Sequence, residues 1–183
     1  MSISSIAPVV TTPMAAKRLV EEAGAAGQTI SFATSPTFDQ RIVQALAQMI
    51  SDTGLVAEIE LTDIAAYLQR VQSAPADQPY LAFGRWSCAC QDVDGVLHSL
   101  LHSSSSWSAL SDPRIDALLD EARNTLDEDQ RLAAYGEVSS FVAEEVPLVP
   151  LYQAAIIYGA ANGLEWQPTS NESMFLNRMG WSD

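Results

Sequence analysis

The chain has 183 residues, 48% of them hydrophobic, and its 23 acidic and 9 basic residues give a formal net charge of -14. Binding to nucleic acid or to anionic lipid surfaces depends on clustered Lys and Arg, so this balance argues against both. The richest apolar run, Ala154 to Ala161, is far shorter than the ~20 residues of a transmembrane helix. The length of the chain favours a single packed domain.

The chain is expected to begin with a lead segment, residues 1–12, that is disordered or foreign to the fold. This segment is not expected to form a secretory signal, because no Lys or Arg precedes its mildly apolar residues and Pro8 interrupts them. Thr12 followed by Pro13 is typical of a helix cap and first turn, so a helix is predicted over about Pro13 to Ala23.

Strands and helices then alternate. Alternating side chains predict strands over Thr29 to Thr34 and over Leu55 to Leu61. Between these strands, a helix that Gly54 ends is predicted from residues spaced along one helix face: Ile42, Val43, Leu46, Ala47, Met49 and Ile50. Thr62 is expected to cap the next helix, whose apolar residues are Ile64, Tyr67, Leu68 and Val71.

A third, buried strand is predicted over Tyr80 to Gly84. The resulting order of strand, helix, strand, helix, strand predicts an α/β fold. We expect a mixed, mostly parallel sheet that is flanked by helices and joined by right-handed crossovers.

The second half is predicted to be mostly helical. Asp112 and Pro113 begin one helix, whose inward residues are Ile115, Leu118, Leu119 and Ala122. Asp127 and Gln130 have the spacing of a capping box for another helix, which Pro147 ends. That second helix presents Leu132, Tyr135, Val138, Phe141 and Val142.

Two more strands are predicted near the C-terminus, over Leu148 to Gln153 and Ala155 to Tyr158. Asn162-Gly163 is a strong turn signal.

The loop after the third strand is the most informative part of the chain. In open α/β sheets, ligands bind beyond the carboxyl ends of the strands, and this loop is polar and aromatic. Trp86 offers a flat apolar ring with one N–H donor, and Arg85 can reach a carboxylate. The candidate ligand-binding residues are Arg85, Trp86, Ser87, Cys88, Ala89, Cys90 and Asp92.

Five short motifs follow one another along the chain. They are Phe83-Gly84-Arg85-Trp86, Asp92-Val93-Asp94, Trp107-Ser108, Asp112 to Leu119 and Val146 to Tyr152. Their order resembles the C-terminal lobe of the family 5 extracellular solute-binding proteins, the dipeptide and oligopeptide class of ABC importer receptors. The resemblance covers residues 13–181. It implies a C-terminal α/β lobe at 13–163 and a return segment at 164–183 toward a missing N-terminal lobe.

The resemblance also implies a periplasmic or extracellular location, with the signal sequence lying upstream of this fragment. In peptide-binding relatives, an Asp three positions after the Trp holds the α-amino group of the peptide. Here that position is Ala89, which favours a solute other than a peptide with a free amine, because a buried ammonium without a counter-charge is costly. Arg85 is an insertion between the usual Gly and Trp.

Cys88 and Cys90 are the only cysteines. We interpret them as two small residues packed near the loop rather than as a redox pair or half of a zinc site, although an exposed pair could oxidise. His98 and His102 are four residues apart on a predicted helix, but no third ligand follows from the sequence. We interpret them as a surface or interface pair and expect neither metal nor cofactor.

The sequence therefore predicts a noncatalytic solute-binding lobe that forms one wall of a cleft for a small polar or peptide-like solute. Its partners would be the ABC permease subunits and the missing lobe. One alternative is a small enzyme that uses Cys88 or Cys90 as nucleophile with His98 as base. Another is a protein-interaction domain with an exposed apolar surface.

Overall fold

The computed structural model describes residues 12–88 and 90–182. Apart from Thr12, the predicted lead segment lies outside the described residues. The helices and strands of the first half are α1 (Pro13–Glu22), β1 (Thr29–Thr34), α2 (Gln40–Ser51), β2 (Val56–Leu61), α3 (Ile64–Val71) and β3 (Leu81–Ala82). Those of the second half are α4 (Asp94–Leu101), α5 (Pro113–Asn124), α6 (Glu128–Glu145), β4 (Leu164–Glu165) and β5 (Gly180–Trp181).

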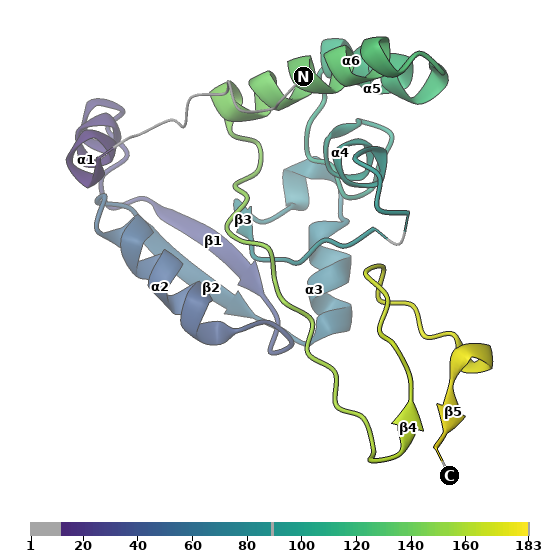
Figure 1. Cartoon of the computed structure of the whole chain (residues 1–183). Coiled ribbons are helices and arrows are strands. Elements are labelled where there is room, and N and C mark those ends of the chain that lie inside the picture. The colour runs from purple at the N-terminus through teal and green to yellow at the C-terminus, as the bar shows by residue number, and fades with distance from the viewer. Residues whose placement is uncertain (1–11, 89, 183) are drawn as a thin grey trace.

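Strands β1, β2 and β3 form a parallel sheet in the order β2-β1-β3 (Figure 1). Thr29 pairs with Val56 at one end of the β1–β2 ladder, and Thr34 pairs with Leu61 at the other. Phe32 of β1 pairs with Leu81 of β3. The α/β prediction of a parallel sheet flanked by helices is confirmed.

Helices α2 and α3 cover opposite faces of this sheet. Phe32 and Ala33 are neighbours in β1, so their side chains point to opposite faces. Phe32 packs with Val43 and Ala47 of α2, whereas Ala33 packs with Tyr67 of α3. All of these residues are buried, and the two clusters anchor the sheet between its helices.

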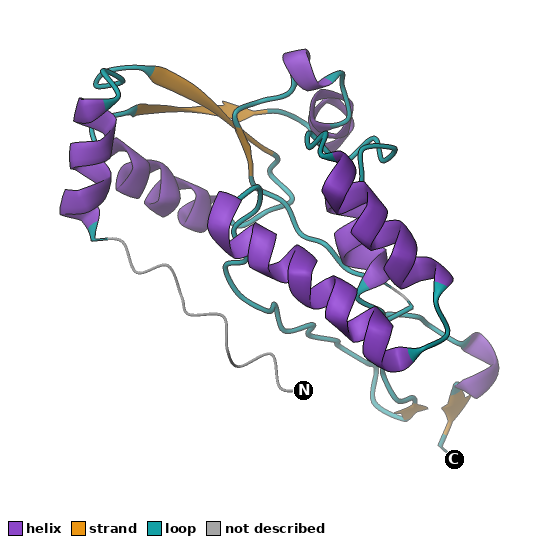
Figure 2. Ribbon diagram, turned by 90° about the horizontal axis from the view of Figure 1, so that it is seen from above, coloured by secondary structure: helices purple, strands orange, loops and turns teal. Residues whose placement is uncertain are grey.

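Helices α4, α5 and α6 form a third cluster beside the sheet (Figure 2). Leu119 of α5 and Val138 of α6 are completely buried there. Trp107, in the loop between α4 and α5, packs against the cluster of Ala33 and Tyr67. This indole therefore connects the helical layer to the sheet.

The helix starts follow the predictions at Thr12 and Asp112, but the cap of α3 was predicted wrongly. Asp63, and not Thr62, caps it, with Asp63 Oδ1 accepting from the N–H groups of Ala65 and Ala66 at 2.9 and 3.0 Å. A carboxylate at this position also interacts favourably with the positive end of the helix dipole.

Helix α6 forms only half of the predicted capping box. Asp127 Oδ1 accepts from Gln130 N–H at 3.0 Å, but Asp127 N–H donates to Thr125 Oγ1 and not to Gln130. Thr125 thus replaces the reciprocal bond. Of the apolar residues predicted for this helix, Leu132 is half exposed.

The third strand is shorter and less buried than predicted. Only Leu81–Ala82 pair with β1, and Tyr80 is 78% exposed. In the described residues β3 has a partner on one side only, so its outer edge and the side chains on it remain open to solvent.

The strands predicted over Leu148 to Gln153 and Ala155 to Tyr158 do not form. This segment runs from α6 toward the β4–β5 hairpin without regular structure (Figure 1). Its apolar side chains suit a strand, but a strand also needs a neighbouring backbone to bond with. Asn162-Gly163 forms the predicted turn, with Gly163 at φ 85°. Among the described residues, no helix has both the length and the apolar character needed to span a bilayer.

Candidate ligand-binding surface

The loop that follows β3 is fixed to the sheet at its base. Phe83 N–H donates to Ala33 O at 2.9 Å, and the Tyr67 hydroxyl donates to Phe83 O at 3.1 Å. Phe83 itself is buried. Because β1 and β3 are parallel, the loop leaves the sheet at the edge where β1 also ends, which is the predicted location for a ligand.

Trp86 is half buried and held on two sides. Its ring meets Trp107 edge to face with centroids 5.1 Å apart, and its indole N–H donates to Gly95 O at 2.9 Å. The N–H donor is thus already used within the protein. What Trp86 offers to a ligand is the exposed part of its apolar ring.

Cys88 and Cys90 form a disulfide with their Cα atoms 5.3 Å apart, so their interpretation as two packing thiols was wrong. The chain turns back on itself at this point, with Gln91 at φ 52° and Gln91 N–H bonded to Cys88 O at 3.0 Å. The disulfide lies against Gly95 at the start of α4, where a Cβ atom would overlap the Cys88 sulfur.

Arg85 and Ser87 are exposed polar residues of the loop. Arg85 Nη2 donates to Glu172 Oε2 at 2.6 Å. Hydrogen bonds from the side chains of Ser87 and Arg85 lower the pKa of the Glu172 carboxyl. The C-terminal segment therefore contacts the predicted site through Glu172.

Asp92 is engaged within the protein. Its Oδ1 accepts from Asp94 N–H at 2.8 Å and from Arg131 Nη2 at 2.6 Å, and these bonds lower the pKa of the Asp92 carboxyl. Arg123 forms a second ion pair with Asp94 at 2.8 Å. Asp92 and Asp94 thus join the start of α4 to α5 and α6. Ala89 lies outside the described residues.

Sequence reasoning missed two polar residues near this edge of the sheet, Ser35 directly after β1 and Gln40 at the start of α2. Ser35 is completely buried, and its hydroxyl has no hydrogen-bond partner in the described part of the chain. The side-chain amide of Gln40 donates to Ser35 O at 2.7 Å. The only signal in the sequence was the position of Ser35 directly after a strand.

His98 and His102 were interpreted as a surface or interface pair. The side chain of His102 is only 12% exposed and lies against Asp116 and Asp120 of α5, so it is at an interface between helices rather than on the surface. The two rings stack with centroids 4.3 Å apart, and Asp120 of α5 approaches them. Burial, followed by the neighbouring charges of Arg123 and His102, lowers the pKa of His98.

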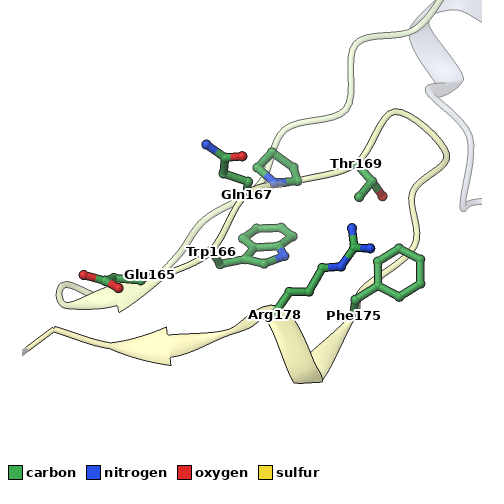
Figure 3. A pocket seen from close by; sticks show the side chains of 7 residues that line it. Glu165, Trp166, Gln167, Thr169, Phe175 and Arg178 are labelled. Atoms are coloured by element: carbon green, nitrogen blue, oxygen red, sulfur yellow. The ribbon is translucent and has the colours of Figure 1, made fainter.

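A separate hollow of about 380 Å³ lies within the C-terminal segment (Figure 3). It is lined by Glu165, Trp166, Gln167, Pro168, Thr169, Phe175 and Arg178. The guanidinium of Arg178 lies over the Phe175 ring at 5.0 Å. The residues of the loop after β3 take no part in this hollow.

No family profile matches the chain. Over 76 residues it is 30% identical to the probable ABC transporter periplasmic-binding protein SapA of Escherichia coli strain K12, a match that covers 39% of this chain and 14% of SapA. Among solved structures, a dipeptide-binding protein from Pseudoalteromonas in complex with Met-Leu aligns over 93% of this chain and 36% of its own, at 20% identity and a TM-score of 0.76.

A substrate-binding protein from Microbacterium hydrocarbonoxydans, complexed with 4-hydroxybenzoate hydrazide, aligns over 89% of this chain and 35% of its own, at 18% identity and a TM-score of 0.70. The chain thus spans about a third of the length of these solved structures. It has the fold of one part of the periplasmic solute-binding proteins of ABC transporters, and the predicted likeness in fold is confirmed.

Proposed function

We propose that this chain is the C-terminal lobe of a solute-binding component of an ABC import system. The observation that supports this most strongly is the alignment of 93% of the chain with one part of a dipeptide-binding protein. The loop from Arg85 to Cys90 would form one wall of the ligand cleft. A second lobe would supply the other wall, and the solute would stabilise the closed state through its greater affinity for it.

The exposed apolar side chains of the segment after α6 fit such a partnership. Val149, Tyr152 and Ile157 are 65%, 61% and 91% exposed. In the proposed receptor, this surface would pack against the remainder of a longer chain. The permease subunits of the importer would be the further partners, and the location would be periplasmic or extracellular.

The proposed solute is small and polar, with an apolar or aromatic portion. Trp86 presents ring surface but no free N–H donor, because that donor binds Gly95. Arg85 would bind a solute carboxylate in exchange for Glu172. The Ala89 position supports a solute other than a peptide with a free amine, and the hydrazide held by the Microbacterium protein is one such compound.

The enzyme alternative loses its nucleophile in this structure. Cys88 and Cys90 are joined, so neither offers a thiolate to pair with His98. The solved structures to which the chain is similar are described as binding proteins. A noncatalytic role is therefore the one we propose.

The test is a tryptophan-fluorescence titration of this chain with di- to pentapeptides and with aromatic and aliphatic carboxylates and hydrazides. We expect weak, saturable binding, because half of the contacts are lacking, and a loss of about tenfold in affinity in Trp86→Ala. Trp181→Ala is the matched control, since Trp181 is 70% exposed in the β4–β5 hairpin. Binding that survives Trp86→Ala, or turnover of any compound, would contradict the proposal.

A further inference from the structure

We propose that His98, His102 and Asp120 bind a divalent transition-metal ion, such as Zn²⁺, where the end of α4 meets α5. One ring nitrogen of each histidine and one carboxylate oxygen of Asp120 lie within 4.8 Å of one another. The sequence shows the two histidines four residues apart, and the fold adds a carboxylate from the next helix. This inference is independent of the proposed solute.

The strongest indication is an unsatisfied nitrogen. Nε2 of His102 is buried and has no hydrogen-bond partner among the described residues, and the nearest carboxylate oxygen, Oδ1 of Asp120, is 3.5 Å away. Buried polar atoms are nearly always paired, so such an atom requires an explanation. An ion between Nε2 and the carboxylate would satisfy both.

The other ring nitrogen of His102 has the surroundings of a metal-binding imidazole. Nδ1 lies 2.7 Å from Ser104 Oγ and 3.8 Å from Asp116 Oδ1. In this structure Nδ1 accepts from Ser104 N–H at 3.0 Å. A metal on Nε2 would require the tautomer with the proton on Nδ1, which would then donate to the Ser104 hydroxyl in place of that bond. Partners of this kind orient histidine ligands in metal sites.

His98 directs a lone pair to the same region. Its Nε2 lies 3.0 Å from Arg123 Nη1, and a guanidinium can only donate, so this nitrogen accepts and carries no proton. The positive charge of Arg123 opposes a cation, but its other nitrogens bond to Asp94 at 2.8 and 3.2 Å. A metal therefore competes with one hydrogen bond at His98 and leaves the Arg123–Asp94 pair in place.

The donor set selects the class of ion. Two imidazoles and one carboxylate suit Zn²⁺, Co²⁺ and Ni²⁺, whereas Ca²⁺ and Mg²⁺ prefer oxygen ligands alone. Zn²⁺ with three protein ligands would take water as the fourth. The ligand atoms must approach one another by about an ångström to reach bonds of ~2 Å, and Asp120, whose side chain is 58% exposed, is free to make this movement.

The test is calorimetric titration of the whole chain with ZnCl₂ in buffer without reductant, so that the disulfide stays closed. We expect one ion per chain and a loss of at least about tenfold in affinity in His102→Asn and in Asp120→Asn. Glu121→Gln removes one negative charge, as Asp120→Asn does, at an exposed neighbouring residue of α5. This variant should leave the affinity for Zn²⁺ unchanged. Co²⁺ should give a visible absorption band that Zn²⁺ abolishes.

A second pair of variants tests the position of the ion. Arg123→Gln should strengthen binding several-fold, because it frees Nε2 of His98, whereas Arg114→Gln on the same helix removes the same charge and should have a much smaller effect. Saturable binding that persists in a folded His102→Asn protein would overturn the proposal. So would the lack of any saturable binding up to ~1 mM free Zn²⁺.

Discussion

Arg85 donates a hydrogen bond of 2.6 Å to Glu172, a residue 87 positions further along the chain. This ion pair connects the loop after β3 to the C-terminal segment, which also contacts the loop where Ser170 Oγ donates to Gln91 Oε1 at 3.2 Å. In the proposed receptor, Arg85 would exchange the Glu172 carboxylate for that of a solute. The position of the C-terminal segment would therefore depend on whether Arg85 is bound to Glu172 or to a solute.

Glu172→Gln should loosen the C-terminal segment. We expect faster amide hydrogen exchange over residues 164–182 in the variant than in the wild-type protein at neutral pH, measured by mass spectrometry. Glu22→Gln, which breaks the exposed Arg18–Glu22 pair in α1, is the control and should leave exchange in this segment unchanged. Equal exchange in Glu172→Gln and wild type would show that the contact does not hold the segment.

The same contact predicts a dependence on pH. The pKa of the Glu172 carboxyl lies below its ordinary value of 4.5 in the folded chain, because of the bonds from Ser87 and Arg85. Its contribution to stability is therefore complete above pH 4.5 and is lost as the pH falls through the folded-state pKa. The exchange difference between wild type and Glu172→Gln should disappear over that acidic range. A difference that persists at the lowest pH would point to another cause.

Gly95→Ala should destabilise the protein, because the new methyl group would overlap the Cys88 sulfur. We expect a loss of about 1–3 kcal/mol in urea denaturation, the usual cost of overpacking. The loss should become smaller when Cys88 and Cys90 are both replaced by Ala.

Gly136→Ala is the matched control for Gly95→Ala. Gly136 lies within α6, and a Cβ atom there would meet nothing within 4 Å. Replacing it should stabilise the protein by about 0.5–1 kcal/mol, since Ala favours helix. If Gly95→Ala and Gly136→Ala changed the free energy of unfolding by the same amount, the disulfide would not be packed on Gly95.

Val146→Gly should stabilise the protein. Val146 caps α6 in the left-handed region, at φ 51°, where a β-branched side chain is strained and glycine is not. Relief of this strain should add about 1 kcal/mol to the free energy of unfolding. Val93→Gly is the control, since Val93 has φ -62°, and it should be neutral or destabilising. A destabilised Val146→Gly would show that Val146 is not strained.

Leu119→Ala tests the helical layer. Leu119 of α5 is completely buried in the cluster that this helix forms with α6. Its truncation should lower the free energy of unfolding, measured by heat or urea, by about 2–5 kcal/mol. Leu126, in the loop between these helices, is fully exposed, so Leu126→Ala should have little effect. A mild Leu119→Ala phenotype would mean that the layer is not tightly packed.

The sequence predicted well where structure depends on local pattern. Thr29–Thr34 and Ile64–Val71 form the predicted strand and helix. Helical spacing buries Tyr67 and Val71 on one face of α3, whereas β1 is buried on both faces. Asp112 begins α5 as expected, since its carboxylate accepts from Arg114 N–H at 2.9 Å. The parallel sheet then follows from the order of these elements.

Prediction failed where structure depends on a distant partner. Leu148 to Gln153 has the residues of a strand but no neighbouring backbone in the described part of the chain. The loop after β3 lies at the predicted edge of the sheet, yet the Arg85–Glu172 pair joins residues that no local pattern relates. Asp120 likewise meets His102 only because α5 packs beside α4. The role of the seven candidate ligand residues stays a prediction.

In the proposed receptor, the loop from Arg85 to Cys90 binds the solute. The most direct measurement is ¹⁵N–¹H NMR of the labelled chain, titrated with the same panel of peptides, carboxylates and hydrazides. We expect at least one compound to shift the amide signals of Arg85, Trp86, Ser87, Cys88 and Cys90, and of Ser35 directly after β1. Shifts confined to other surfaces, such as the hollow around Trp166 and Arg178, or no shifts with any compound, would contradict it.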